Sequence, residues 1–426
     1  MCRDLAFCAA RCVFWCVAGF AAVSLMATQG ARASDAPPPL RIYVDADFTL
    51  TPAPADAITL GLRVAFAKSG NMAAGQVLEV VEADHRGSPK RSHRSMQSVL
   101  RDPNALVVIG GMHSPPYLTY GDFINAQGIP LVLPWSAAGP ITRLADGPQN
   151  HIFRLSVDDT KAGPFLVRSA LGGECRRIAV LLADTGWGRA NRATIVSAMV
   201  QAGVEPSSVL VVPNGVGEAT GRQLVRQLNA SRPDCLLAAL TSPTHGPVLK
   251  ALVDIAPDIM VFSHWGIMGQ RLREPAMQDI LARLDIRVLQ TCELQMEAQG
   301  KPRISAALSE ARDLGADASS LSDIPAVAGF VHAYDIGRIL IAAVEQAAAT
   351  PAWQDGSAAR RTALRDALEN LGAPVEGMLA TYAPPFSPVG PETPDGHEAL
   401  GLEQLCLARF DEGRLVAAPQ APLQGG

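Results

Sequence analysis

Short runs of consecutive apolar residues alternate with longer amphipathic segments along most of this 426-residue chain. In the longer segments, apolar positions recur every three or four residues, which is the period of a helix that packs against a core. The run Ala105-Leu-Val-Val-Ile109 is apolar at every position, so both of its faces must be covered. Strands between two layers of helices have this pattern, and their alternation with helices predicts doubly wound, parallel α/β sheets.

The strand and helix pattern occurs twice and is followed by a third, more helical block. In the first series we expect strands at 41–48, 77–83, 105–111 and 130–135, and helices at 54–69, 89–101 and 115–127. Each of these helices has a proline near its first turn, where the missing N–H costs little. In the second series we expect strands at 177–184, 208–213, 235–240 and 258–263, and helices at 160–171, 189–202, 218–229 and 246–254. The third block predicts a strand at 287–294, helices at 324–349 and 357–371, and strands at 377–384 and 405–411.

Length and composition limit the number of domains and the kind of partner. A chain of 426 residues suits two domains of about 150 to 200 residues each. Hydrophobic residues make up 48% of the chain, charged residues 18%, and the net charge is -5. This balance argues against disorder and against a polybasic surface for nucleic acid. The expected partner is therefore a small molecule or another protein.

The N-terminus predicts export from the cytoplasm. Arg3 and Arg11 flank an apolar run that extends from Val13 to Met26, and Ala31-Arg-Ala33 follows with the pattern that signal peptidase recognises. We expect cleavage after Ala33 and a mature protein in the periplasm. The run of about fourteen residues is shorter than the roughly twenty that span a bilayer. A retained membrane anchor is the alternative.

Export changes the interpretation of the cysteines. Four of the eight lie in the predicted signal peptide, and the mature chain keeps Cys175, Cys235, Cys292 and Cys406. Their wide separation excludes a zinc ribbon and a CxxC redox motif. One or two disulfides can form in the periplasm, and four buried free thiols are the alternative. The sequence does not choose among the pairings.

Catalytic and cofactor motifs are missing from the sequence. It contains no GxSxG, HExxH, Walker or GxGxxG pattern, and its eight histidines lack the spacing of metal ligands. A serine hydrolase that uses Ser114 with His113 or His264 is the enzymatic alternative, although no motif supports it. We therefore expect no enzyme activity, no cofactor and no metal.

Several segments carry a family resemblance through their order and spacing. These are Val108-Ile-Gly-Gly-Met-His-Ser114, Gly128-Ile-Pro-Leu-Val-Leu-Pro134, Phe153-Arg154, Asp158-Asp159, Arg177-Ile-Ala-Val-Leu-Leu-Ala-Asp184 with Trp187-Gly188, Tyr334-Asp335 and Arg409-Phe-Asp-Glu-Gly413. Together they resemble the leucine/isoleucine/valine-binding proteins of bacterial ABC importers over nearly all of the mature chain. The resemblance implies a type I periplasmic binding fold, which has two Rossmann-like lobes joined by a three-segment hinge. The lobes would be 40–155 plus 292–375 and 156–290 plus 380–420, after a signal peptide at 1–33.

The resemblance also implies a function. Proteins of this family bind a small molecule between their lobes and deliver it to membrane permease subunits. For this chain it implies an amino-acid-like ligand or a related carboxylate or amide, and the tryptophans discussed below add an aromatic compound. The alternative is a free extracellular sensor that reports the ligand to a signalling partner.

Candidate ligand-binding residues follow the predicted strands, because open doubly wound sheets bind ligands beyond the carboxyl ends of their strands. They are Ser114, Trp135, Ser136, Ala137, Trp187, Thr241, Ser242, His264 and Trp265. Ser114 matches the family serine that holds the ligand carboxylate, and it precedes a helix start whose free N–H groups favour an anion. A plain helix N-cap is the alternative role for Ser114. Ala137 stands where relatives usually have a threonine, so Ser136 is expected to supply the hydroxyl.

Three of the four tryptophans in the mature chain fall on these loops. Trp135, Trp187 and Trp265 together predict an aromatic wall, which suits an apolar, aromatic or cationic ligand. The alternative is that each ring simply plugs the edge of a sheet. Family members that bind amino acids usually have an acidic residue near the Trp265 loop, whereas this chain has His264. Either another carboxylate, from Asp184, Asp122 or Asp47, replaces it, or the ligand is not an ordinary α-amino acid.

Overall fold

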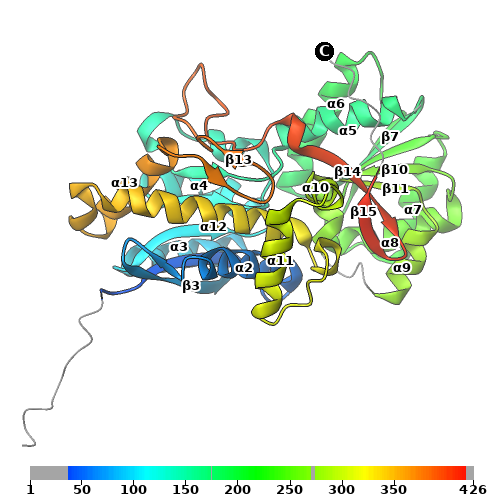
Figure 1. Ribbon diagram of the computed structural model, residues 1–426. Coiled ribbons are helices and arrows are strands. Elements are labelled where there is room, and N and C mark those ends of the chain that lie inside the picture. Colours follow the sequence, from blue (N-terminus) through cyan, green and yellow to red (C-terminus); the bar gives the residue numbers. More distant parts are fainter. Residues whose placement is uncertain (1–36, 174, 270–273, 419–426) are drawn as a thin grey trace, which may run out of the picture. The chain divides into compact units, whose positions relative to one another are not determined.

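The computed structural model describes residues 37–173, 175–269 and 274–418. The predicted signal peptide, its cleavage site after Ala33 and the tail at 419–426 lie outside these residues. Two large sheets, both flanked by helices, account for most of the regular structure (Figure 1). The assignment of residues to two lobes stays a prediction.

The first sheet is doubly wound. Its strands are β1 (Leu40–Ala46), β2 (Met72–Ala73), β3 (Gln76–Asp84), β4 (Ala105–Gly110), β5 (Leu131–Leu133) and β6 (Ile152–Arg154). They lie in the order β2-β3-β1-β4-β5-β6, and every pair except β2 with β3 is parallel. The parallel strands therefore follow the order second, first, third, fourth, fifth, which places a topological switch point between β1 and β4.

An antiparallel hairpin at the edge of this sheet differs from the expected all-parallel arrangement. Strands β2 and β3 are joined by Ala74 and Gly75, and both residues have positive φ angles, of 48° and 73°. A tight hairpin turn requires this backbone conformation at both positions. Alanine is an unusual residue for such a turn, so only Gly75 indicated the hairpin in the sequence.

The second sheet repeats the topology of the first. Its strands are β7 (Ile178–Ala183), β8 (Ser208–Val212), β9 (Cys235–Ala239), β10 (Met260–Ser263), β11 (Ile286–Thr291), β14 (Leu405–Asp411) and β15 (Arg414–Ala417). The order is β15-β14-β11-β10-β9-β7-β8, and strands β7 to β11 are parallel with the switch point between β7 and β9. Strands β14 and β15 extend the sheet in antiparallel fashion. The predicted doubly wound α/β fold is confirmed.

Helices connect the strands. They are α2 (Pro52–Ala67), α3 (Pro89–Arg101), α4 (Pro115–Ala126), α5 (Asp159–Gly172), α6 (Gly186–Gln201), α7 (Glu218–Asn229), α8 (Ser242–Ile255), α9 (Pro275–Ala282), α10 (Glu293–Ala298), α11 (Pro302–Asp313), α12 (Val327–Ala348) and α13 (Ser357–Glu369). Short 3-10 turns are η1 (Gly139–Arg143), η2 (Gly147–Gln149), η3 (Trp265–Gly269), η4 (Leu321–Asp323), η5 (Pro351–Gln354) and η6 (Leu402–Gln404). Strands β12 (Val375–Glu376) and β13 (Thr381–Tyr382) form a separate small hairpin.

The late part of the chain departs most from the predicted elements. The strand expected at 287–294 ends at Thr291, and Glu293 begins α10. The strand expected at 377–384 is reduced to the two residues of β13. The buried carboxylate of Asp335 accepts hydrogen bonds from the N–H groups of Met378 and Leu379. These two N–H groups therefore do not bond to a neighbouring strand. Elements α9, α11 and β15 were not predicted.

Helix α12 lies along α2, and glycines permit their close approach (Figure 1). A Cβ atom added at Gly61 would stand 2.3 Å from the carbonyl oxygen of Phe330, and one at Gly337 would stand 2.6 Å from Cβ of Ala65. Within the described residues, α12 is the one helix whose length and composition would allow a membrane span. Of its apolar window, 83% is buried inside the structure, which is typical of a core helix.

Disulfides join all four cysteines of the predicted mature chain. Cys175, which precedes β7, is bonded to Cys235 at the start of β9, and Cys292, which follows β11, is bonded to Cys406 in β14. The sequence left the pairing open, with four free thiols as the alternative. The tertiary structure decides it because residues 60 and 114 positions apart become neighbours in one sheet.

Removing the longer disulfide should destabilise the protein substantially. In the loop-entropy description, crosslinks that close loops of this length stabilise the folded state by about 4 to 5 kcal/mol. We expect the Cys292→Ser, Cys406→Ser double variant to lose a large part of this free energy of unfolding in urea titrations. The matched variant, Cys175→Ser with Cys235→Ser, should lose a similar amount. Alkylation of all four cysteines in the native, unreduced protein would contradict the pairing.

Candidate functional site

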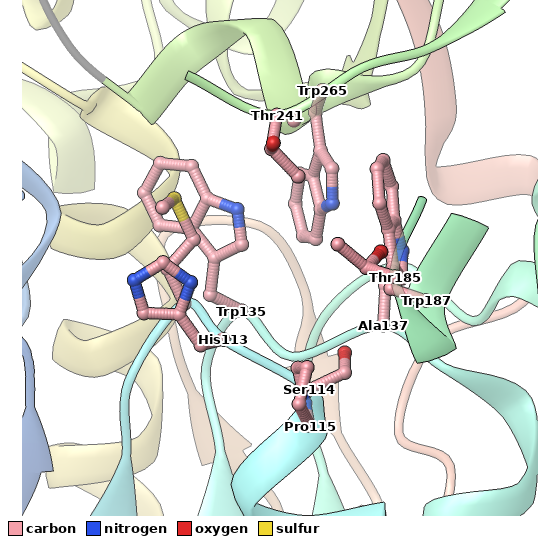
Figure 2. Close-up of a pocket in the computed structure, with 11 residues that line it drawn as sticks. His113, Ser114, Pro115, Trp135, Ala137, Thr185, Trp187, Thr241 and Trp265 are labelled. Carbon is pink, nitrogen blue, oxygen red and sulfur yellow. The ribbon is translucent and has the colours of Figure 1, made fainter. Parts of the chain in front are cut away.

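A pocket lies where the carboxyl ends of strands from both sheets come together (Figure 2). Its lining comes from the loops after β4, β5, β7, β9 and β10, namely Met112, His113, Ser114, Pro115, Trp135, Ala137, Thr185, Trp187, Thr241, Trp265 and Gly266. The loops after β4, β7 and β9 flank the two switch points, where doubly wound sheets place their ligands. The free space is about 460 Å³, part of it open to solvent, and water-sized molecules can be centred in only about 60 Å³ of it.

The three tryptophans predicted to form a wall do meet at this pocket. Trp135 and Trp265 are each 1% exposed and Trp187 is 7% exposed. The rings of Trp135 and Trp265 lie 5.4 Å apart at an angle of 41°. This tilted arrangement suits the quadrupoles of two aromatic rings. The rings come from loops of different sheets, so aromatic contacts connect the two sides of the pocket.

Glycine and a helix cap set the position of Trp187. Thr185 is the N-cap of α6, and its hydroxyl accepts a hydrogen bond from the N–H of Gly188 at 3.0 Å. Trp187 thus lies in the first turn of α6. A Cβ atom at Gly266 would stand 2.8 Å from Cη2 of Trp187, so a larger residue there would displace this ring. Sequence reasoning missed Thr185, although its place before Gly186-Trp187-Gly188 is a capping signal.

Ser114 lines the pocket, but not in the way the sequence predicted. Its hydroxyl accepts from the N–H of Ala138 at 3.3 Å and makes no capping hydrogen bond to α4, so the plain N-cap role does not hold. The first two residues of α4, Pro115 and Pro116, carry no N–H, and the N–H of Tyr117 donates to the Ser114 carbonyl. Free helix amides for an anion are therefore missing here, and the Ser114 hydroxyl proton is the group that remains.

Ser136 and Ala137 take opposite positions. Ala137 lines the pocket, whereas Ser136 is fully buried and its hydroxyl donates to the carbonyl oxygen of Gly111 at 2.7 Å. The expected replacement of the missing threonine by Ser136 therefore does not hold in this structure. Thr241 lines the pocket at the start of α8, where it and Thr244 form a capping box. The side chain of Ser242 lies outside the described part of the structure.

His264 stands behind the tryptophan wall. It is fully buried, packs edge-on against Trp187, and places Nε2 at 2.9 Å from Oδ1 of Asp159. The other oxygen of Asp159 accepts a hydrogen bond from Nδ2 of Asn191 at 2.8 Å. An acidic residue is thus present near the Trp265 loop, but its carboxylate accepts from Asn191, lies beside His264 and does not line the pocket. In the sequence, Asp159 stood out only as part of the Asp158-Asp159 segment of the family resemblance.

None of the three suggested substitute acids lines the pocket. Asp184 is exposed beside Arg189, and Asp122 borders a separate depression. Asp47 is buried, and its Oδ2 lies 3.5 Å from Nε2 of His113, which does line the pocket. Burial opposes ionisation of Asp47, but hydrogen bonds from His113 and from the N–H of Leu50 lower its pKa well below the usual range. The Asp47 charge is therefore committed to His113 and Leu50.

A catalytic serine-histidine pair is not formed by these residues. Nε2 of His113 lies 3.2 Å from the hydroxyl of Thr51, and His264 faces Asp159. Among the described residues, neither histidine hydrogen-bonds to Ser114, so the geometry does not support the serine hydrolase alternative.

A buried chain of hydrogen bonds connects the second sheet to the loop that carries Trp135. The carboxyl of Glu293 lies 2.6 Å from the hydroxyl of Thr291, which lies 2.7 Å from Nε2 of His332. Nδ1 of His332 lies 2.8 Å from the carbonyl oxygen of Pro134. Burial raises the pKa of Glu293 to about 8 and lowers the pKa of His332 to about 4. At neutral pH both groups are therefore uncharged.

The direction of this chain follows from its last acceptor. The Pro134 carbonyl can only accept, so Nδ1 of His332 donates and its neutral Nε2 must accept from Thr291. The Thr291 proton is then committed, and a protonated Glu293 completes the chain as donor. Burial of the carboxyl, which raises the pKa of Glu293, favours the same protonated form.

Comparison with known proteins identifies the class. A family model described as periplasmic binding protein matches residues 51–397. Fold, pocket position and family model agree, and the chain belongs to the periplasmic binding protein family. The predicted resemblance is thereby confirmed, while the identity of the ligand is not given by it. A search of curated protein sequences finds no significant match.

Solved structures share the fold at low sequence identity. A type 1 periplasmic binding protein from Bordetella pertussis Tohama I superposes with a TM-score of 0.72 at 14% identity, over 89% of this chain and 100% of its own. An ABC-transporter solute-binding protein from Rhodopseudomonas palustris HaA2, in complex with p-hydroxybenzoic acid, superposes with a TM-score of 0.71 at 16% identity. The superposition covers 89% of this chain and 95% of that protein. An ABC-transporter substrate-binding protein from Desulfitobacterium hafniense, in complex with Leu, superposes with a TM-score of 0.66 at 16% identity. The superposition covers 90% of this chain and 100% of that protein. At these identities the similarity shows the fold alone.

The raised pKa of Glu293 predicts how stability depends on pH. The folded state holds this proton up to about pH 8, whereas the unfolded chain releases it near pH 4.5, so the contribution is lost as pH rises through this window. Glu293→Gln keeps a donor for Thr291 and cannot ionise. We expect the free energy of unfolding of Glu293→Gln to rise relative to that of the wild type as the pH increases. The rise should total about 1.4 kcal/mol for each unit by which the pKa of Glu293 differs between the folded and unfolded states.

Urea unfolding at about pH 5, 7 and 9 measures this difference. Glu205→Gln, which removes an exposed carboxylate, is the control and should follow the wild-type profile. Parallel profiles for Glu293→Gln and the wild type would show that Glu293 is not held protonated.

Proposed function

We propose that this protein is the solute-binding component of an ABC importer, and that it binds a small aromatic carboxylate in the tryptophan pocket. The mature protein would act in the periplasm after cleavage at Ala33 and deliver its ligand to membrane permease subunits. One observation carries the ligand class: the described lining residues include three tryptophans and no carboxylate. The ammonium group of an α-amino acid would be desolvated there without a partner, which is costly.

The size of the pocket supports a binding mechanism with a moving site. The space for water-sized molecules, about 60 Å³, holds on the order of four waters and is too small for a substituted ring. The lining comes from loops of both sheets, so separation of these loops would admit the ligand. Contacts from both sides would then favour the closed form, which is how hinge closure is driven in two-lobed binding proteins.

Relatives of the same fold bind both ligand classes. Besides the p-hydroxybenzoic acid complex, a solute-binding protein of an ABC transporter from R. palustris is in complex with benzoate, with a TM-score of 0.67 at 16% identity. The D. hafniense protein is in complex with Leu. Fold similarity therefore does not select a ligand. The choice of an aromatic carboxylate rests on the pocket itself.

A thermal-shift screen tests the ligand class. Benzoate and 4-hydroxybenzoate should raise the melting temperature of the mature protein, whereas L-leucine and benzylamine should not, because their ammonium groups find no counter-charge. A ligand at about a hundred times its Kd adds about 2.7 kcal/mol to stability. Trp353→Phe, which changes a buried tryptophan outside the pocket, should keep the response. A response to L-leucine alone would contradict the proposal.

Uptake measurements test the transport role. A strain that lacks this protein should lose high-affinity uptake of the aromatic carboxylate that gives the largest thermal shift, and the wild-type gene should restore it. The sensor alternative predicts a different result: uptake would persist in the deletion strain, and a transcriptional response to the same compound would be lost. The second result would overturn the importer role while leaving the ligand class intact.

A further inference from the structure

One polar atom at the pocket has no partner within the described structure. The indole nitrogen of Trp135 is buried without a hydrogen bond, and the side chain is 1% exposed. Buried indole N–H groups usually have a hydrogen-bond acceptor, and leaving one unpaired destabilises the folded state. An orphan donor at a pocket wall is therefore a sign that something else supplies the acceptor.

The position of this nitrogen relates it to the pocket and not to the core. Figure 2 shows it on the side of the Trp135 ring that faces Trp265, while the hydroxyl of Ser114 points into the space between the tryptophans. Trp135 has its own backbone fixed by neighbours: the preceding residue, Pro134, accepts from His332, and the following residue, Ser136, donates to Gly111. The donor is thus held in place before any ligand arrives.

The remaining hydroxyls near it also have protons to donate. Ser114 accepts a hydrogen bond from the N–H of Ala138, and Thr185 accepts one from the N–H of Gly188. Each hydroxyl keeps its own proton, and an indole nitrogen can only donate. The pocket therefore offers donors from loops of both sheets. A carboxylate or carbonyl oxygen satisfies such a set, whereas an ammonium group, which carries donors only, does not.

We infer that Trp135 is a specificity-determining residue whose indole N–H donates a hydrogen bond to an oxygen acceptor of the ligand. The inference deepens the proposed function and rests on it, because it assigns the polar contact of the same pocket. Among the three pocket tryptophans, Trp135 is the one whose indole nitrogen is buried without a partner in the described part of the chain. The ligand would then place its ring among the tryptophans and one oxygen against Nε1 of Trp135.

Substitution by phenylalanine separates the donor from the ring. Trp135→Phe removes the N–H and keeps an aromatic side chain, and Trp187→Phe makes the same change on the other wall as the matched control. Isothermal titration with benzoate and 4-hydroxybenzoate should show that Trp135→Phe weakens the tighter of the two by about tenfold or more. Trp187→Phe should weaken it by less than about threefold, because it removes similar ring surface but not the buried, unpaired donor.

The outcomes separate the inference from the proposed function. If the wild type binds an aromatic carboxylate and Trp135→Phe binds it as well as Trp187→Phe does, the inference is overturned and the proposed function stands. If the wild type binds neither carboxylate, the proposed ligand class fails and the inference fails with it. Selective loss in Trp135→Phe supports both.

A second measurement observes Trp135 itself without substituting it. Spectra of the wild-type mature protein with 15N-labelled tryptophan report each indole N–H, and the variants Trp187→Phe, Trp265→Phe and Trp353→Phe assign the Trp135 signal by elimination. Titration with benzoate should move the Trp135 indole proton downfield, as expected for a new hydrogen bond to a carboxylate. A Trp135 signal that stays in place while benzoate binds would overturn the inference even if Trp135→Phe does not fold.

Discussion

The buried guanidinium of Arg154 organises the region on which the pocket depends. Its Nε and Nη2 donate to the two oxygens of Glu398 at 2.7 and 2.6 Å, and its Nη1 donates to the carbonyl of Ala138 at 2.9 Å. A fully buried cation persists only when its donors are paired, and removal of one partner typically costs about 3 to 5 kcal/mol. One side chain therefore ties the end of β6, the loop that bears Trp135 and Ala137, and a residue more than 240 positions later. Correct placement of the pocket wall depends on this convergence.

The acidic side chains around the pocket face other protein side chains and not the pocket. Asp159 accepts from Asn191 and lies beside His264, Asp47 faces His113, and Glu398 accepts from Arg154. Each carboxylate thereby positions a side chain or a loop beside the pocket and contributes no charge to its lining. The polar side-chain groups that do reach the lining are indole rings, hydroxyls and the imidazole of His113. The selectivity proposed for the site thus arises from two features. The nearby carboxylates are bound to other protein groups, and the residues that face the ligand are aromatic or carry hydroxyls.

Sequence reasoning located the pocket loops but not the direction of each side chain. Strand ends are visible in the apolar pattern, so Ser114, Trp135, Ala137, Trp187, Thr241 and Trp265 were placed where the structure has them, on the pocket lining. Ser136 and His264 lie on the same loops but turn into the interior, where Ser136 donates to Gly111 and His264 lies beside Asp159. Adjacent residues on one loop can face opposite ways, and local sequence does not say which. Thr185 and His113 were missed as lining residues for the same reason.

The sequence by itself determined the order and type of the main elements, because the period of apolar residues is a local property that burial imposes on every strand and helix. It also determined that three tryptophans follow strand ends. The tertiary structure decided the disulfide pairs, the partners of the buried acids and the unpaired indole N–H of Trp135. Each of these depends on atoms brought together from residues tens to hundreds of positions apart, such as Cys292 and Cys406. Only the folded chain fixes those distances, and with them the chemistry that the pocket can offer.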